Sequence, residues 1–184
     1  LIINNTIAGN LPKSTSGGIE CVTNSAAIIE NNIIVSNGSG YGVYTLITAP
    51  VLRYNDVWGN GAGSYSSMTG EQTGINGNIS SDPLFADAAG DDYHLKSTGW
   101  RWNGSGWQYD SITSRCIDAG NPGCPLGGEL MTIPVDPDHL RGRNLRIDMG
   151  GCGGSAESSM PPYNWGLLAD MTNDGQVNTT DLSI

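Results

Sequence analysis

The stretch Ile28-Ile29-Glu30-Asn31-Asn32-Ile33-Ile34-Val35-Ser36-Asn37 decides the fold, because its core pattern Asn-x-(Ile/Val)-x-x-Asn recurs along the chain. The pattern starts at Asn5, Asn32 and Asn55, with spacings of 27 and 23 residues, and Asn78 follows after another 23 as a weaker fourth copy. A period of this length is typical of stacked supersecondary units. We therefore expect Asn5, Asn32 and Asn55 to form a ladder of hydrogen-bonded side chains with a structural, not a catalytic, role.

The repeats also predict the fold class. Each holds about three short runs rich in Ile and Val, separated by Asn, Gly and Ser, without the 3.6-residue period of a helix. Stacked runs of this kind predict an all-β parallel solenoid with columns of inward-facing Ile and Val side chains. Glu30 and Arg53 occupy equivalent positions of adjacent coils, so we expect them to form an ion pair.

Composition narrows the choice of partners. The 184 residues include 18 acidic and eight basic ones, which gives a net charge of −10 and argues against nucleic acid or an anionic membrane as partner. Residues 82–184 carry fourteen of the acidic residues. No apolar run is long enough to span a membrane. The chain opens within a repeat and stops within a motif, so we expect it to be a fragment of a longer protein.

The cysteines and histidines leave alternatives open. Cys21 is expected to be a packed thiol, whereas Cys116–Cys124 or Cys124–Cys152 could form a disulfide in an oxidising compartment. His94, inside an apolar run, is interpreted as a core residue. Nothing in the sequence marks a pair of catalytic carboxylates or a nucleophile beside a base, so whether the chain is an enzyme stays open.

Residues 100–109 predict a β-hairpin, because aromatic residues alternate on both sides of an Asn-Gly-Ser-Gly turn. One hypothesis is that Trp100, Trp102, Trp107 and Tyr109 form a platform that stacks on sugar rings. The alternative, which we favour, is a lid that closes the open end of the solenoid.

Near the C-terminus the sequence follows the plan of a twelve-residue calcium loop. Oxygen ligands are expected from the side chains of Asp170, Thr172, Asp174, Asn178 and Asp181 and from the backbone carbonyl of Gln176. Ca²⁺ is therefore the expected cofactor. The loop resembles the first repeat of a type I dockerin, truncated before a second loop, and this resemblance implies a cohesin-like scaffold as partner.

The order of motifs carries a second resemblance. Short Asn-rich coils are followed by Asp82-Pro83-Leu84-Phe85, Tyr93-His94-Leu95, Cys116-Ile117-Asp118-Ala119-Gly120 and Ile147-Asp148-Met149-Gly150. This order resembles secreted bacterial right-handed parallel β-helix proteins related to pectate lyases. The resemblance implies solenoid coils over residues 1–81, a cap over 82–157, a linker over 158–166 and a short helical dockerin-like calcium loop over 167–184.

The same resemblance implies an extracellular or cell-surface protein that binds or processes polysaccharide and is anchored through its calcium loop. Two alternatives stay open. One is a polysaccharide lyase or hydrolase whose catalytic coils precede Leu1, and the other is a non-catalytic surface or adhesin spacer.

Overall fold

The described part of the computed structural model comprises residues 1–11, 15–22, 26–134, 136, 142–163 and 165. It is all-β with parallel sheets, as the sequence predicted. Nine strands form three three-stranded parallel sheets. The first sheet contains β1 (Ile2–Ile3), β4 (Ile28–Glu30) and β7 (Val51–Arg53); the second contains β2 (Thr6–Ala8), β5 (Ile33–Val35) and β8 (Asp56–Trp58); the third contains β3 (Ser16–Cys21), β6 (Tyr41–Thr45) and β9 (Gly63–Tyr65).

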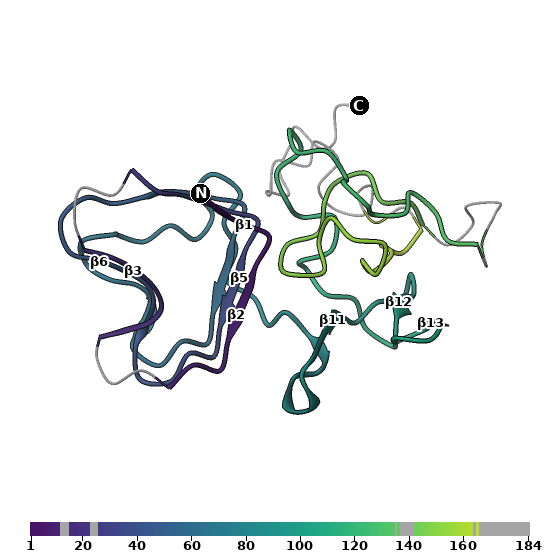
Figure 1. Cartoon of the computed structure of the whole chain (residues 1–184), viewed down its shortest axis with the longest axis horizontal. Helices are drawn as coiled ribbons and strands as arrows, with labels where there is room; N and C mark the ends of the chain where they lie inside the picture. Colours follow the sequence, from purple (N-terminus) through teal and green to yellow (C-terminus); the bar gives the residue numbers. More distant parts are fainter. Residues whose placement is uncertain (12–14, 23–25, 135, 137–141, 164, 166–184) are drawn as a thin grey trace.

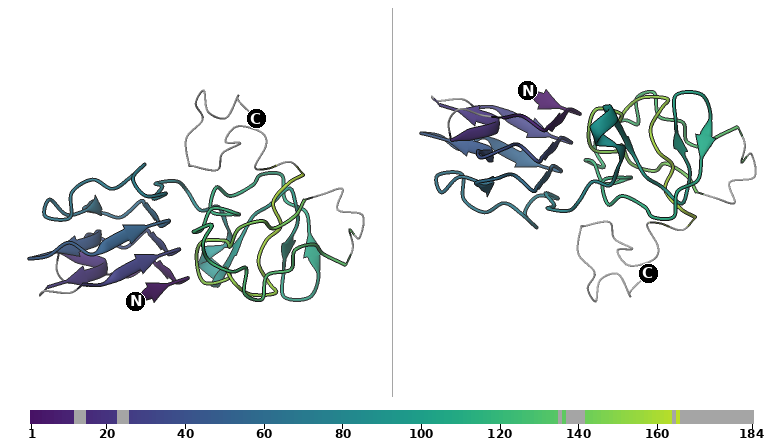
Figure 2. Two further views of the ribbon diagram at one scale, coloured as in Figure 1. Left: turned by 90° about the horizontal axis from the view of Figure 1, so that it is seen from above. Right: turned by 90° about the horizontal axis from the view of Figure 1, so that it is seen from below.

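Three successive passes of the chain each add one strand to every sheet (Figures 1 and 2). The repeat sets the register, because Ile7 pairs with Ile34 and Ile34 with Val57. Apolar side chains from all three sheets meet between them in one buried cluster. Its buried members are Ile19, Cys21, Ile29, Ile34, Val43, Leu52, Val57 and Tyr65. Cys21 is thus a packed thiol, and the Glu30–Arg53 ion pair is formed, which confirms both expectations.

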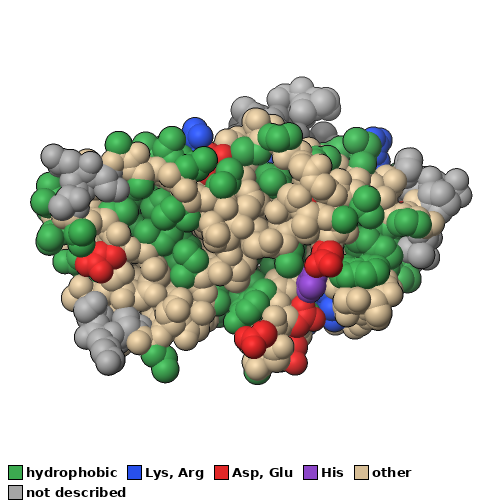
Figure 3. All heavy atoms as spheres, viewed as in Figure 1, with side chains coloured by type: hydrophobic (Ala, Val, Ile, Leu, Met, Phe, Trp, Pro, Cys, Tyr) green, Lys and Arg blue, Asp and Glu red, His purple; other side chains and the backbone are tan. Residues whose placement is uncertain are grey.

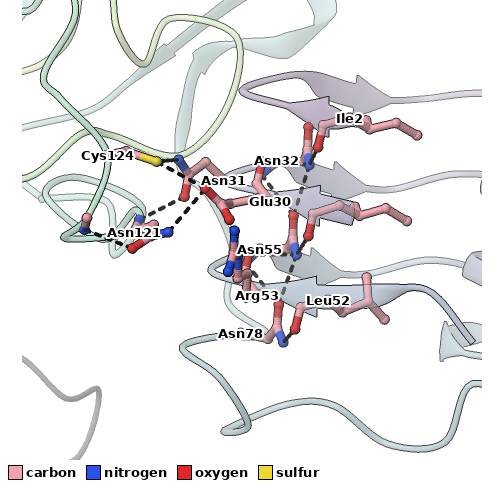
Figure 4. Close-up of polar contacts among 12 residues, drawn as sticks. Ile2, Glu30, Asn31, Asn32, Leu52, Arg53, Asn55, Asn78, Asn121 and Cys124 are labelled. Carbon is pink, nitrogen blue, oxygen red and sulfur yellow. Dashed lines mark hydrogen bonds and ion pairs between the residues drawn. The ribbon is translucent and has the colours of Figure 1, made fainter. Parts of the chain in front are cut away.

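The side-chain amides of Asn5, Asn32, Asn55 and Asn78 form a continuous ladder, of which Figure 4 shows the part from Asn32 to Asn78. Each Nδ2 donates to the Oδ1 of the next asparagine, over 3.1, 3.0 and 3.0 Å. The backbone N–H of Asn32 also donates to Asn55 Oδ1 over 3.0 Å. The ladder therefore satisfies buried polar groups at the bend between the first and second sheets.

A second ladder joins Asn10, Asn37 and Asn60 at the next bend, with side-chain distances of 2.9 Å at both steps. The left-handed backbone lies one residue before each ladder asparagine, for example with φ of 56° at Asn31 and 55° at Ser36. Asparagine supplies the amide at these bends, while its predecessor makes the sharp turn.

The described residues within 82–163 form a second region beside the second sheet (Figures 1 and 2). It contains β10 (Phe85–Asp87), the 3₁₀ turn η1 (Ala88–Gly90), β11 (Asp92–Leu95), β12 (Arg101–Trp102) and β13 (Trp107–Gln108), followed by turns and loops. The two antiparallel pairs are β10–β11 and β12–β13. A second apolar cluster joins this region to the sheets and contains Ile33, Val35, Leu95, Cys116, Ile117 and Met149.

This arrangement corrects the predicted cap. The hairpin β12–β13 is present, but it lies away from the three sheets instead of covering an end of the stack (Figures 1 and 2). Ser159 and Met160, expected in a linker, are buried. Ser159 Oγ donates to the carbonyl of Leu95 over 2.6 Å, and the N–H of Met160 donates to that of Trp100 over 2.8 Å. The chain near residue 160 is therefore part of the second region.

Candidate functional site

A cavity of about 690 Å³ opens where the first pass of the sheets meets the second region. Its walls come from the start of β2, from η1 and β11, from the turn of the hairpin and from the loop at Cys152. Most of the residues that line it carry polar side chains: Asn4, Asn5, Thr6, Asp91, Asp92, Tyr93, His94, Asn103 and Cys152. On the face in Figure 3, acidic side chains gather around a histidine.

Strand β11 places Asp92 and His94 on the same side, because alternate residues of a strand share a face. His94 Nδ1 lies 2.6 Å from Asp92 Oδ1, which also accepts the backbone N–H of His94 over 3.1 Å. The other Asp92 oxygen lies 3.7 Å from Arg101 Nη1, and Arg101 Nε donates to Asp110 Oδ2 over 3.0 Å. Asp92 is thus held in place by a buried arginine while it orients the imidazole ring.

Cys152 faces the same cavity from a glycine-rich loop and is half-buried. The pKa of His94 is raised to about 9, mainly by interaction with Cys152 and to a smaller extent by Asp92, although burial opposes this shift. His94 Nε2 is buried and makes no well-aligned hydrogen bond within the described residues. Glu157 Oε2 lies 3.6 Å from it. Nε2 therefore keeps its hydrogen-bonding capacity.

Two sequence interpretations fail here. His94 lines the cavity and is only half-buried, so it is not a core residue. All four cysteines are free thiols, so neither Cys116–Cys124 nor Cys124–Cys152 is a disulfide. Cys116 Sγ instead donates to buried Asp56 over 3.2 Å, and Cys124 Sγ donates to Glu30 over 3.0 Å. The i, i+2 spacing of Asp92 and His94 in a predicted strand was the signal that could have located the site.

The predicted aromatic platform is brought together only in part. Trp102 and Trp107 lie opposite each other in the hairpin, with ring centroids 5.8 Å apart and planes inclined by 68°. Trp100 precedes β12 with a φ of 89°, and Tyr109 follows β13 with its side chain exposed. The four rings thus form no flat surface. The turn between the two strands, however, contributes Asn103 to the cavity.

A second polar cluster joins the two regions around Glu30 (Figure 4). Burial alone would raise the pKa of Glu30, but hydrogen bonds from Cys124 and Asn121 and the pairing with Arg53 hold it below its usual value. Asn31 Oδ1 accepts the backbone N–H of Asn121 over 2.8 Å. This cluster has every group partnered by the protein, so we interpret it as structural.

A buried acidic pair lies within the second region. Glu129 Oε1 accepts the backbone N–H groups of Asp148 and Gly154, both over 2.8 Å, and Asp148 Oδ1 accepts that of Asp118. Glu129 Oε2 and Asp148 Oδ2 are buried without a protein donor among the described groups. Burial raises the pKa of Glu129 to about 7, and burial and the neighbouring Glu129 raise that of Asp148 well above its usual value.

The predicted calcium ligands Asp170, Thr172, Asp174, Gln176, Asn178 and Asp181 lie outside the described residues. Within the described ranges, no group of three or more His, Cys, Asp or Glu side chains is arranged to hold a metal ion. Calcium binding by this loop therefore stays a prediction.

Comparison with known proteins places the chain in a family. The family model described as Disaggregatase related matches residues 2–120, which is well over half of the chain. The chain belongs to the disaggregatase-related family. The matched residues of this disaggregatase-related chain include the three sheets, Asp92, His94 and the hairpin, whereas Cys152 lies beyond them. Searches of curated proteins and of solved structures found no match.

The family match corrects the resemblance drawn from the order of motifs. The disaggregatase-related assignment replaces the expected kinship with pectate-lyase-like β-helix proteins carrying a dockerin repeat. The described residues contain the 3₁₀ turn η1 and no α-helix, and none of them forms a helix long and apolar enough to cross a membrane. The motifs Asp-Pro-Leu-Phe and Cys-Ile-Asp-Ala-Gly are turns and short strands that close the second region against the sheets.

Proposed function

We propose that this chain binds polysaccharide in the cavity between the sheets and β11. The observation that carries the proposal is the lining of the cavity, which combines amide, hydroxyl and carboxylate groups. Carboxylate and amide groups bond to pairs of sugar hydroxyls. A volume of about 690 Å³ suits a ligand of drug-like size, which corresponds to a short stretch of glycan.

The charge of the cavity narrows the class of glycan. Asp91 and Asp92 line it, and Glu157 lies beside His94. These carboxylates carry the same negative charge as a uronic acid and therefore repel uronic acids. Neutral sugars and protonated amino sugars meet no such repulsion. We therefore infer a neutral or amino-sugar polymer as the ligand.

We also propose that the three sheets are coils of a right-handed parallel solenoid in an extracellular protein. The regular register of the passes and the two asparagine ladders support the solenoid. The family description supports an action on aggregated material, because the name disaggregatase denotes separation of an aggregate. A polysaccharide that holds units together is a ligand consistent with that name. The alternative of a non-catalytic spacer leaves the polar cavity without a role.

The test is affinity electrophoresis in gels that contain xylan, chitosan or polygalacturonate. Retardation is expected with xylan or chitosan and not with polygalacturonate. Asp91→Asn should weaken the retardation by chitosan, because it removes a negative charge from the cavity. Asp82→Asn is the matched control, because Asp82 is exposed and lies outside the cavity. Loss of retardation in Asp82→Asn with none in Asp91→Asn would place the glycan elsewhere and contradict the proposal.

A further inference from the structure

We propose that Cys152, His94 and Asp92 form a thiol-based acyl-transfer site that cleaves a carboxylic ester. The substrate class is an O-acyl group on a sugar hydroxyl, and this part of the inference rests on the proposed binding of polysaccharide in the same cavity. Three features carry it: the three side chains line one cavity, Asp92 orients the imidazole, and the remaining ring nitrogen makes no well-aligned hydrogen bond within the described protein.

The arrangement meets the geometric needs of a nucleophile with a base. A nucleophilic thiol requires a base beside it, and the base requires a third group that fixes its ring. Asp92 Oδ1 fixes the proton of the imidazole on Nδ1, over 2.6 Å, so that Nε2 carries the lone pair that a base needs. The raised pKa of His94 indicates that the imidazolium form is favoured, and this form stabilises a thiolate.

The charged groups around His94 come from every element packed against it. Asp92 lies on its own strand, Arg101 on β12 contacts Asp92, and Glu157 and Cys152 belong to the loop after Gly150. Arg101 neutralises part of the charge on Asp92, whereas Glu157 competes with the thiolate for Nε2. We expect Glu157→Gln to strengthen the thiolate–imidazolium pairing, because it removes this competing carboxylate.

The chemistry balances with water as the only co-reactant. The Cys152 thiolate attacks the carbonyl carbon, the bond from that carbon to the alcohol oxygen breaks, and the alcohol leaves with the proton of the His94 imidazolium. Water then attacks the thioester while the imidazole takes its proton, which releases the carboxylic acid and regenerates the thiol–imidazole pair. The backbone N–H of Cys152 donates to no group in the described residues, so it is the candidate donor to the carbonyl oxygen in both steps.

The experiment uses the full chain with two probes, p-nitrophenyl acetate and O-acetylated xylan. We expect p-nitrophenol release, and a mass increase of one acetyl group on the peptide that contains Cys152. Cys152→Ala should lower the turnover by about 10²–10⁴-fold, the range of base-assisted nucleophilic steps. Asp92→Asn should lower the turnover and shift its pH profile, because Asp92 acts through the ring of His94.

The controls separate a site from adventitious thiol chemistry. Cys124→Ser removes another half-buried thiol outside the cavity and should leave turnover unchanged. Cys152→Ser retains the shape of the site, so a folded but inactive serine variant supports the proposal even if the alanine variant unfolds. Unchanged turnover in folded Cys152→Ser, or acetylation of Cys124 in preference to Cys152, would overturn it.

The two probes distinguish this inference from the proposed function. Turnover of p-nitrophenyl acetate without retardation by any polysaccharide would contradict the proposed glycan binding and support the thiol site. Retardation by xylan with no Cys152-dependent release of acetate from either probe would contradict the thiol site and support the glycan-binding cavity.

Discussion

The side chain of Asn32 donates to that of Asn55 over 3.0 Å, although 23 residues separate them along the chain. The same Asn55 Oδ1 also accepts the backbone N–H of Asn32. One amide therefore closes the bend of its own pass and fixes the position of the pass before it. This dual use explains why the spacing of asparagines, more than the identity of the apolar residues, sets the register of the sheets.

Replacing Asn55 by alanine should destabilise the protein by about 3–5 kcal/mol, because several buried groups lose their partners at 1–3 kcal/mol each. The carbonyl of Ile29 and the N–H of Asn32 are among them. Urea unfolding followed by circular dichroism measures the effect. Asn5→Ala is the matched control at the exposed end of the ladder and should cost about 1 kcal/mol. Equal costs in the two variants would contradict the proposed role of burial.

Gly61→Ala should be severely destabilising. A β-carbon at Gly61 would overlap the carbonyl oxygen of Gly38 in the neighbouring pass, so the passes would have to move apart. We expect a loss of about 3 kcal/mol, at the upper end of overpacking costs. Gly106→Ala is the control, because a β-carbon there meets no atom within 4 Å. Thermal unfolding of both variants checks the prediction, and a Gly61→Ala variant as stable as Gly106→Ala would show that the passes are less closely packed.

Glu129→Gln should make the protein more stable at pH 8. The pKa of Glu129 is raised from 4.5 to about 7 in the fold, so the folded state binds the extra proton between these values and loses stability as pH rises through them. Glutamine stays neutral and can still accept from Asp148 and Gly154. We expect a gain on the order of 2 kcal/mol at pH 8 and little change at pH 4.

The control for the Glu129 experiment is Glu20→Gln, since Glu20 is exposed. Denaturant unfolding between pH 4 and pH 8 gives the slope of stability with pH for each variant. A slope that is no shallower in Glu129→Gln than in Glu20→Gln would show that the fold does not raise the pKa of Glu129.

Asp92→Asn should lower the pKa of His94 from about 9 towards 6.5, and Cys152→Ala should do so independently. The raised pKa means that the protonated ring stabilises the fold fully below pH 6.5, and that this contribution is lost as pH rises through 9. Titration of the His94 ring protons by nuclear magnetic resonance measures the shift. A ring that titrates near 6.5 in the wild type would disprove the coupling to both groups.

Calcium titration should show heat of binding in the full chain, and Asp174→Ala should abolish it, because removing a central carboxylate takes away a ligand and a charge. Removal of calcium with a chelator should leave Asp92 and His94 unaffected, since neither belongs to the loop. Binding that persists in Asp174→Ala would exclude residues 170–181 as the ligand set.

The sequence predicted the sheets because their signal is periodic and local. Asn32 and Asn55 lie at a fixed spacing, the apolar runs between them repeat, and a repeat of this kind admits few arrangements. The second ladder at Asn37 and Asn60 was visible in the same motif, but the prediction used only its first asparagine. The left-handed residue before Asn55 was missed, because Tyr54 gives no sequence signal for such a backbone.

The second region was less predictable because its contacts span long sequence separations without a pattern. Cys116 meets Asp56, sixty residues earlier, and no spacing rule links them. The pairing of His94 with Asp92 could have been predicted from their alternation in a strand, whereas the approach of Cys152 depends on how an irregular loop packs against β11. The predicted cap failed for the same reason, since apolar side chains on the outside of the second sheet attract this region to its flank.

The first two passes differ in length by four residues, since the ladder steps are 27 and 23 residues, yet the strands on either side stay aligned. The asparagine side chains at the bends fix the positions of the strands, so the segments between the bends can vary in length. Insertions at the outer bends would therefore leave the sheets unchanged, and the same fold could present many different loop surfaces.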